Sequence, residues 1–90
     1  MTHLAILRDN NTRLSYAFAS ESFKRIESEM YDCLLNNAGF MRDELEILEY
    51  EEGEKRQNIC ADGEYTIRHI KHTGESFKLL ITTPNTFEII

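Results

Sequence analysis

The feature that most constrains the fold of this chain is an alternation of apolar and polar side chains in its C-terminal half. The alternating positions are Tyr65, Ile67 and His69 before a turn, and Phe77, Leu79 and Ile81 after it. A period of two residues places these side chains on one face of an extended strand. The intervening His72-Thr73-Gly74-Glu75 is typical of a turn, so the pattern predicts a β-hairpin with strands at residues 64–71 and 76–82.

The N-terminal residues show the same pattern on both sides of the cluster Asp9-Asn10-Asn11-Thr12. The apolar positions are Leu4, Ile6, Leu14, Tyr16 and Phe18. Asp and Asn favour turns because their side chains bond to the nearby backbone. A second hairpin is therefore predicted, with residues 3–8 paired to residues 12–18.

Between the two hairpins, apolar residues recur at spacings of three and four. They are Phe23, Ile26, Met30, Cys33 and Leu34. This spacing predicts a helix over residues 21–37, with Ser20 as its N-cap and Gly39 as its C-terminal stop. The apolar stripe of such a helix needs a surface to pack on, and the predicted sheet supplies it.

The segment from Met41 to Glu54 fits both a helix and a strand. Its high Glu content favours a helix, whereas repulsion between neighbouring carboxylates favours a strand, which we expect at 44–51. A polar connection follows at 54–63. The predicted order is β-β-α-β-β-β, an α+β fold in which a single two-layer domain over residues 1–90 has an antiparallel sheet with one main helix on one face. The apolar tail at 86–90 is expected to add an edge strand or cover the core.

The charge of the chain is concentrated in the same segment. Residues 41–54 hold seven of the sixteen acidic residues and only one basic residue, so they carry the whole formal net charge of −6. Residues 1–40 sum to −1 and residues 55–90 to +1. An acidic surface on a nearly neutral body is typical of a chain that binds a basic partner.

The composition argues against several classes of partner. A pI near 5.0 disfavours direct binding to nucleic acid, whose affinity comes from Lys and Arg at the phosphates. No apolar run approaches the roughly 20 residues that span a bilayer, so we expect no membrane partner. The first residues lack the basic and apolar regions of a signal peptide, and we expect a cytoplasmic protein.

The sequence predicts no catalytic residue, metal ligand or cofactor. On a strand, His69 and His72 would point to opposite faces, which argues against a zinc site with H-x-x-H spacing. Cys33 lies among the apolar positions of the helix, and Cys60 lies in the polar connection without a CxxC partner. The acidic cluster lacks the spaced oxygen ligands and central Gly of a calcium loop.

The leading hypothesis is a small module that binds, and inhibits, a basic nucleic-acid-handling or defence protein by charge mimicry. Phage-encoded inhibitors, antitoxins and immunity proteins share its size and charge. The simplest interpretation of the acidic segment is a solvated face that keeps the chain soluble. The presence of Tyr50 among the carboxylates favours an interface instead. The predicted partner-binding residues are Asp43, Glu44, Glu46, Glu49, Tyr50, Glu51 and Glu52.

Two alternatives belong to other classes. The first is an oligomerising structural or adaptor protein that uses its sheet edges and the C-terminal tail at 86–90 to add to a neighbouring sheet, so homo-oligomer formation is left open. The second is a small ligand-binding or enzymatic domain with His69, His72 and Arg68 around a shallow pocket. The basic residues of the C-terminal half are expected to pair with cross-strand Glu residues rather than to form a functional patch.

Overall fold

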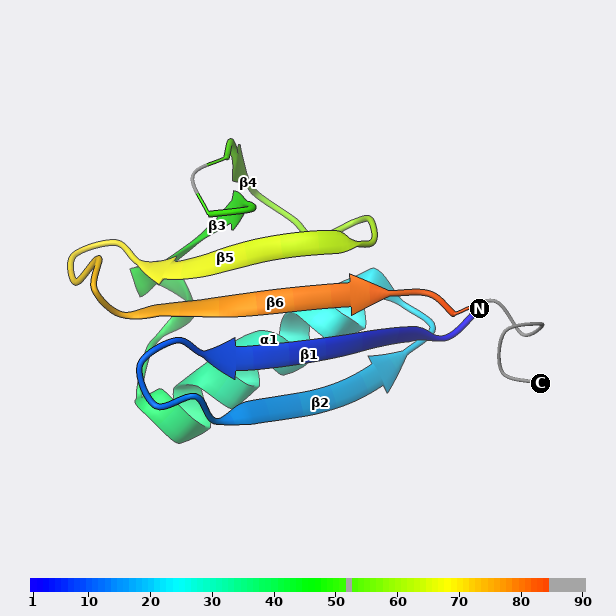
Figure 1. Cartoon of the computed structure of the whole chain (residues 1–90), viewed down its shortest axis with the longest axis horizontal. Coiled ribbons are helices and arrows are strands. Elements are labelled where there is room, and N and C mark those ends of the chain that lie inside the picture. Colours follow the sequence, from blue (N-terminus) through cyan, green and yellow to red (C-terminus); the bar gives the residue numbers. More distant parts are fainter. Residues whose placement is uncertain (52, 85–90) are drawn as a thin grey trace.

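The computed structural model describes residues 1–51 and 53–84, which form one six-stranded antiparallel sheet with a helix packed on one face (Figure 1). This is the predicted two-layer α+β fold. The elements are β1 His3–Asp9, β2 Ser15–Ser20, α1 Phe23–Ala38, the 3₁₀ helix η1 Arg42–Glu44, β3 Leu45–Glu49, β4 Lys55–Arg56, β5 Gly63–His69 and β6 Ser76–Thr82. The strands lie in the order β2-β1-β6-β5-β3-β4.

Both predicted hairpins are confirmed, and the N-terminal one has a longer turn than expected. β1 pairs with β2 and β5 pairs with β6, both antiparallel. The Asp9 side chain accepts hydrogen bonds from the backbone N–H groups of Asn11 and Thr12. This turn delays the second strand, which begins at Ser15 rather than at residue 12.

The helix has the predicted C-terminal stop but a different N-cap. Ser22, not Ser20, has the extended backbone of an N-cap, and its side chain accepts the Arg25 N–H. Ser20 instead ends β2, and its hydroxyl accepts the Ser22 N–H. Gly39 has φ 73°, and its N–H closes the last turn.

The core lies between the helix and the inner face of the sheet. Odd-numbered residues of β1, β3, β5 and β6 meet across the strands on this face, as the pairs Leu7 with Leu79 and Ile67 with Phe77 show. The helix contributes Ile26, Met30 and Leu34, each at most 1% exposed. The predicted apolar stripe therefore packs against the predicted faces of β5 and β6. In β1 the predicted face is wrong, because the odd-numbered Ala5 and Leu7 are buried whereas Leu4 and Ile6 lie on the outer face of the sheet.

The ambiguous acidic segment forms a strand, as expected, although a shorter one. η1 turns the chain after the helix, and β3 then runs antiparallel to β5. The predicted polar connection is partly wrong, because Lys55 and Arg56 pair with β3 as the short strand β4. The predicted apolar tail at 86–90 lies outside the described residues. Within the described ranges, no helix is long and apolar enough to cross a membrane.

Glu27 fixes the connection between β4 and β5 to the helix. Its side chain is 5% exposed, and one carboxylate oxygen accepts the Ile59 N–H at 2.7 Å. The other accepts from the Arg42 guanidinium at 3.0 Å. A buried carboxylate is tolerated only with such partners, so this contact determines where Ile59 enters the core.

Candidate interaction surfaces

The predicted acidic site is spread over three elements at one edge of the sheet. Asp43 and Glu44 lie in η1, Glu46 and Glu49 in β3, and Tyr50 and Glu51 in the turn that follows. Glu52 lies outside the described residues. In β3 the side chains alternate, so Glu46 points to the outer face of the sheet and Glu49 to the inner side. The strand therefore separates these two carboxylates.

Glu46 is already neutralised by two cations. Arg68 on β5, its register partner, donates through Nε at 2.9 Å and Nη2 at 2.6 Å to one carboxylate oxygen, and Lys55 Nζ lies 2.8 Å from the other. The side chain is only 11% exposed. Lys55 and Arg68 hold the pKa of Glu46 below its ordinary value. Glu46 is therefore not part of a solvated acidic face.

Two further carboxylates of the acidic segment also have local partners. Glu49 pairs with Arg56 on β4 at 2.9 Å. Glu44 accepts the Met41 N–H at 2.8 Å, and this bond lowers the pKa of its carboxyl. The expected cross-strand pairing of the basic residues is thus confirmed for Lys55, Arg56, Arg68 and Lys78, the last with Glu64.

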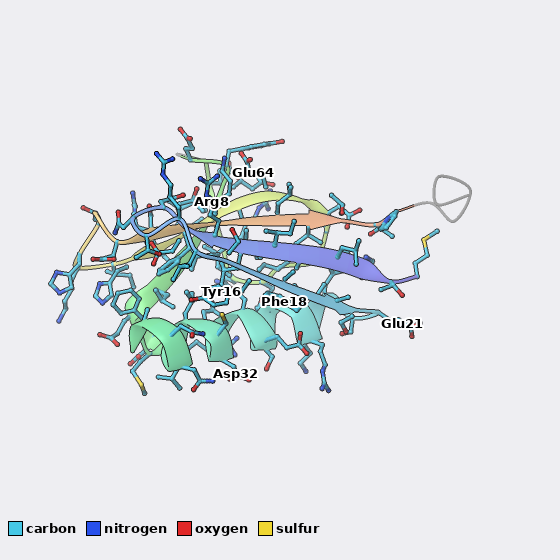
Figure 2. All side chains as sticks on the ribbon, turned by 60° about the horizontal axis from the view of Figure 1, so that its bottom comes forward. Arg8, Tyr16, Phe18, Glu21, Asp32 and Glu64 are labelled. Atoms are coloured by element: carbon cyan, nitrogen blue, oxygen red, sulfur yellow. The ribbon has the colours of Figure 1, made fainter. Side chains whose placement is uncertain are left out.

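Three of the predicted site residues remain free to meet a partner. Asp43, Tyr50 and Glu51 are exposed, and the Tyr50 side chain is 64% exposed. Tyr50 has φ 54°, an uncommon conformation for a residue with a side chain. Most of α1 packs against β1 and β2. Its Asp32, on the outer side of the helix in Figure 2, lines a shallow pocket with Met41 and Arg42, so this carboxylate lies near the acidic segment.

The two histidines are closer than expected. β5 ends at His69 and the chain turns back, so the rings of His69 and His72 lie 4.7 Å apart rather than on opposite faces. The backbone N–H groups of Lys71 and His72 donate to Nδ1 of His69 at 3.1 and 3.0 Å. The ring proton is therefore on Nε2, which faces Glu44 at 3.4 Å. With its ring nitrogens engaged, His69 serves to hold the turn.

No candidate metal cluster of three or more His, Cys, Asp or Glu residues occurs in the described part of the chain. Cys33 and Cys60 are both free thiols. Cys33 is half-buried, and this burial raises the pKa of its thiol.

The two edges of the sheet differ in a way that sequence reasoning missed. β4 forms one edge with only two residues, Lys55 and Arg56, both charged and exposed. This is how natural sheets protect an edge from pairing with another chain. β2 forms the other edge with six residues, Ser15–Ser20, which include neither a charge nor a Pro. In Figure 1 it is the lowest strand, with β1 above it and no strand below it.

Hydrogen-bond phase shows which backbone groups of β2 are free. Asp9 faces Leu14 as a hydrogen-bonded pair, because the Asp9 N–H donates to the Leu14 carbonyl at 2.8 Å. Along an antiparallel ladder, facing pairs alternate between hydrogen-bonded and non-hydrogen-bonded. Tyr16, Phe18 and Ser20 therefore direct their backbone groups at β1. Those of Ser15, Ala17 and Ala19 point outward, and among the described residues their N–H groups have no partner.

The outer face beside this edge is apolar. Leu4 and Ile6 of β1 and Leu80 of β6 are 44%, 47% and 39% exposed. The register places Ala19 beside Leu4, and Ala17 beside Ile6. A shallow groove between β1 and β2 is lined by Leu4, Ile6, Ala17 and Ala19 among others. We call β2 together with this face the open edge. It was missed because a short uncharged stretch becomes informative only when the strand order shows that it lies at an edge.

Comparison with protein-family models, with curated proteins and with solved structures gave no match for this chain.

Proposed function

We propose that the protein is a protein–protein interaction module that binds a partner polypeptide by adding the partner's strand to β2. The observation that supports this proposal best is the contrast between the two sheet edges. The charged, two-residue β4 edge is protected, whereas the uncharged, six-residue β2 edge is open. Strand addition draws its affinity from backbone hydrogen bonds and its specificity from alternating side-chain contacts.

The open edge offers both kinds of contact. The outward N–H and C=O groups of Ser15, Ala17 and Ala19 supply the backbone bonds. On the outer face, the groove by Leu4 and Ile6 would accept apolar side chains from alternate positions of the added strand. The protein would thus recognise an extended segment of five or six residues with apolar residues at every second position.

A displayed library of extended peptides tests this proposal. We expect enriched peptides to shift the amide resonances of Ser15, Ala17 and Ala19 in the wild-type protein. An Ala17→Lys variant should lose this binding, because a charged edge opposes strand addition. The matched control is Ser28→Lys, which adds the same charge at an exposed helix position. Binding that survives Ala17→Lys, or shifts confined to the acidic segment, would contradict strand addition at β2.

The acidic inhibitor is a second candidate, and the exposed Tyr50 beside Glu51 favours it. Aromatic side chains within a charged rim are common anchors of interfaces. Its free charge is smaller than the sequence indicates, because Glu46 and Glu49 are paired within the molecule. In this proposal the module acts in the cytoplasm on a basic nucleic-acid-handling protein, as phage inhibitors and antitoxins do.

The inhibitor proposal has its own test. Reversing Asp43 and Glu51 to Lys should abolish capture of a basic enzyme at about 50 mM salt, where exposed charges are weakly screened. Glu46 and Glu49 are kept, because their ion pairs hold β3 to β4 and β5. If the wild type and the charge-reversed variant capture the enzyme equally at low salt, the acidic segment is a solvated face and not the interface.

A further inference from the structure

We infer that the strand added to β2 is the β2 strand of a second copy of this chain, in a two-fold antiparallel register centred on Ala17. This inference rests on the proposed function, and it names the occupant of the open edge. Three observations support it: the spacing of the free backbone groups, the side chains that this register brings together, and the distribution of charge over the sheet.

The free backbone groups are symmetric about Ala17. An antiparallel pair related by a two-fold axis perpendicular to the sheet places Ala17 opposite its own copy, and Ser15 opposite Ala19 of the other copy. All three outward-facing residues of each strand are then used. The pairing closes about six backbone hydrogen bonds and joins two sheets into one, with both helices on the same side.

The inner side chains fit the same register. Tyr16 faces Phe18 of the other copy, twice, in the non-bonded positions where cross-strand side chains come closest. Figure 2 shows Tyr16 and Phe18 between β2 and α1, and both are only half-buried in the single chain. Pairing would give each ring an aromatic neighbour, and such cross-strand aromatic pairs are stabilising.

Charge also favours a second copy at this edge. The acidic segment that carries the net charge of −6 lies in η1, β3 and the following turn, at the opposite edge of the strand order. Pairing through β2 places the two acidic segments at the far ends of the joined sheet. Residues 1–40, which form β1, β2 and the helix, sum to only −1. Like-charge repulsion between copies is therefore small at this contact.

The register can be tested by a charge swap at its centre. The dimerisation of wild-type protein is measured by sedimentation velocity from about 5 to about 500 µM. This range is chosen because an interface made by a single pair of strands is small and is expected to be weak. Ala17→Lys places two like charges opposite each other on the two-fold axis and should weaken dimerisation about fivefold or more. Ala17→Glu should do the same. Mixing the two variants should restore the dimer as a heterodimer, since opposite charges then meet.

Controls separate this inference from the proposed function. Ser28→Lys should dimerise as the wild type does, and circular dichroism checks that each variant is folded. If the wild type stays monomeric throughout this concentration range, a second copy is not the strand that binds β2. The displayed peptide library then still decides whether another strand is added there. Dimers that persist in both Ala17 variants, or that disappear only when the chain ends at Pro84, overturn the register and assign the contact to another surface.

Discussion

Replacing the buried Glu27 by Ala should destabilise the protein by about 1.5–4.5 kcal/mol. The substitution leaves the Ile59 N–H without its acceptor in a buried position, which costs about 1–3 kcal/mol. The exposed Arg42 loses its ion pair, worth about 0–1 kcal/mol. Removal of the buried methylene adds about 0.8 kcal/mol, and the better helix propensity of Ala offsets a few tenths, about 0.4 kcal/mol.

Glu27→Gln is the matched control. Its carbonyl oxygen still accepts the Ile59 N–H, so only the interaction with Arg42 is weakened, and we expect a loss of about 1 kcal/mol or less. Urea unfolding measures the free energies, and hydrogen exchange at the Ile59 amide locates the effect. An Ala variant within about 0.5 kcal/mol of the wild type, or unchanged exchange at Ile59, would show that the carboxylate does not hold this connection.

Three further outcomes are expected. Because the folded pKa of Glu46 lies below the ordinary 4.5, the stability that its ionised carboxylate contributes is present above that value and is lost as the pH falls through the folded pKa. Between about pH 7 and pH 3, the wild type should therefore lose more free energy of unfolding than Glu46→Gln does. Equal losses in the two proteins would count against the ion pairs. His69→Phe keeps the ring but removes an acceptor, so the amide of His72 should exchange about tenfold faster, and unchanged exchange would argue against the assigned tautomer. Gly53→Ala should lower the free energy of unfolding in urea by about 1–3 kcal/mol, because a Cβ would collide with the Glu49 carbonyl. A variant that unfolds at the same urea concentration as the wild type would show that this turn is not tight.

The sequence predicted the elements whose signals are local and periodic. The hairpin of β5 and β6 and the helix stripe were found because alternation and 3.6-residue spacing record which side chains the core buries. The N-cap was assigned to Ser20 instead of Ser22 because both hydroxyls suit the position and only the backbone distinguishes them. β4 was missed because two charged residues carry no strand pattern.

The acidic site was predicted less well, for an electrostatic reason. Counting charges along the sequence shows only that Glu46 has acidic neighbours. The sheet register brings Arg68 and Lys55 to it from other strands. Charge density along the chain therefore overstated the free charge at the surface. Strand addition at a sheet edge was one of the alternatives from the sequence, but which edge is open was not predicted. Strand order is a non-local property that short uncharged segments do not encode.

Hydrogen exchange of the wild-type β2 amides as a function of protein concentration shows whether β2 of one copy pairs with β2 of another. We expect the amides of Ser15, Ala17 and Ala19 to exchange rapidly in dilute solution and to become protected as concentration rises. Those of Tyr16 and Phe18, which bond to β1, should be protected throughout. Exchange of the three outward amides that is independent of concentration would contradict self-pairing. The same rapid exchange in the presence of every selected peptide would contradict strand addition at β2 altogether.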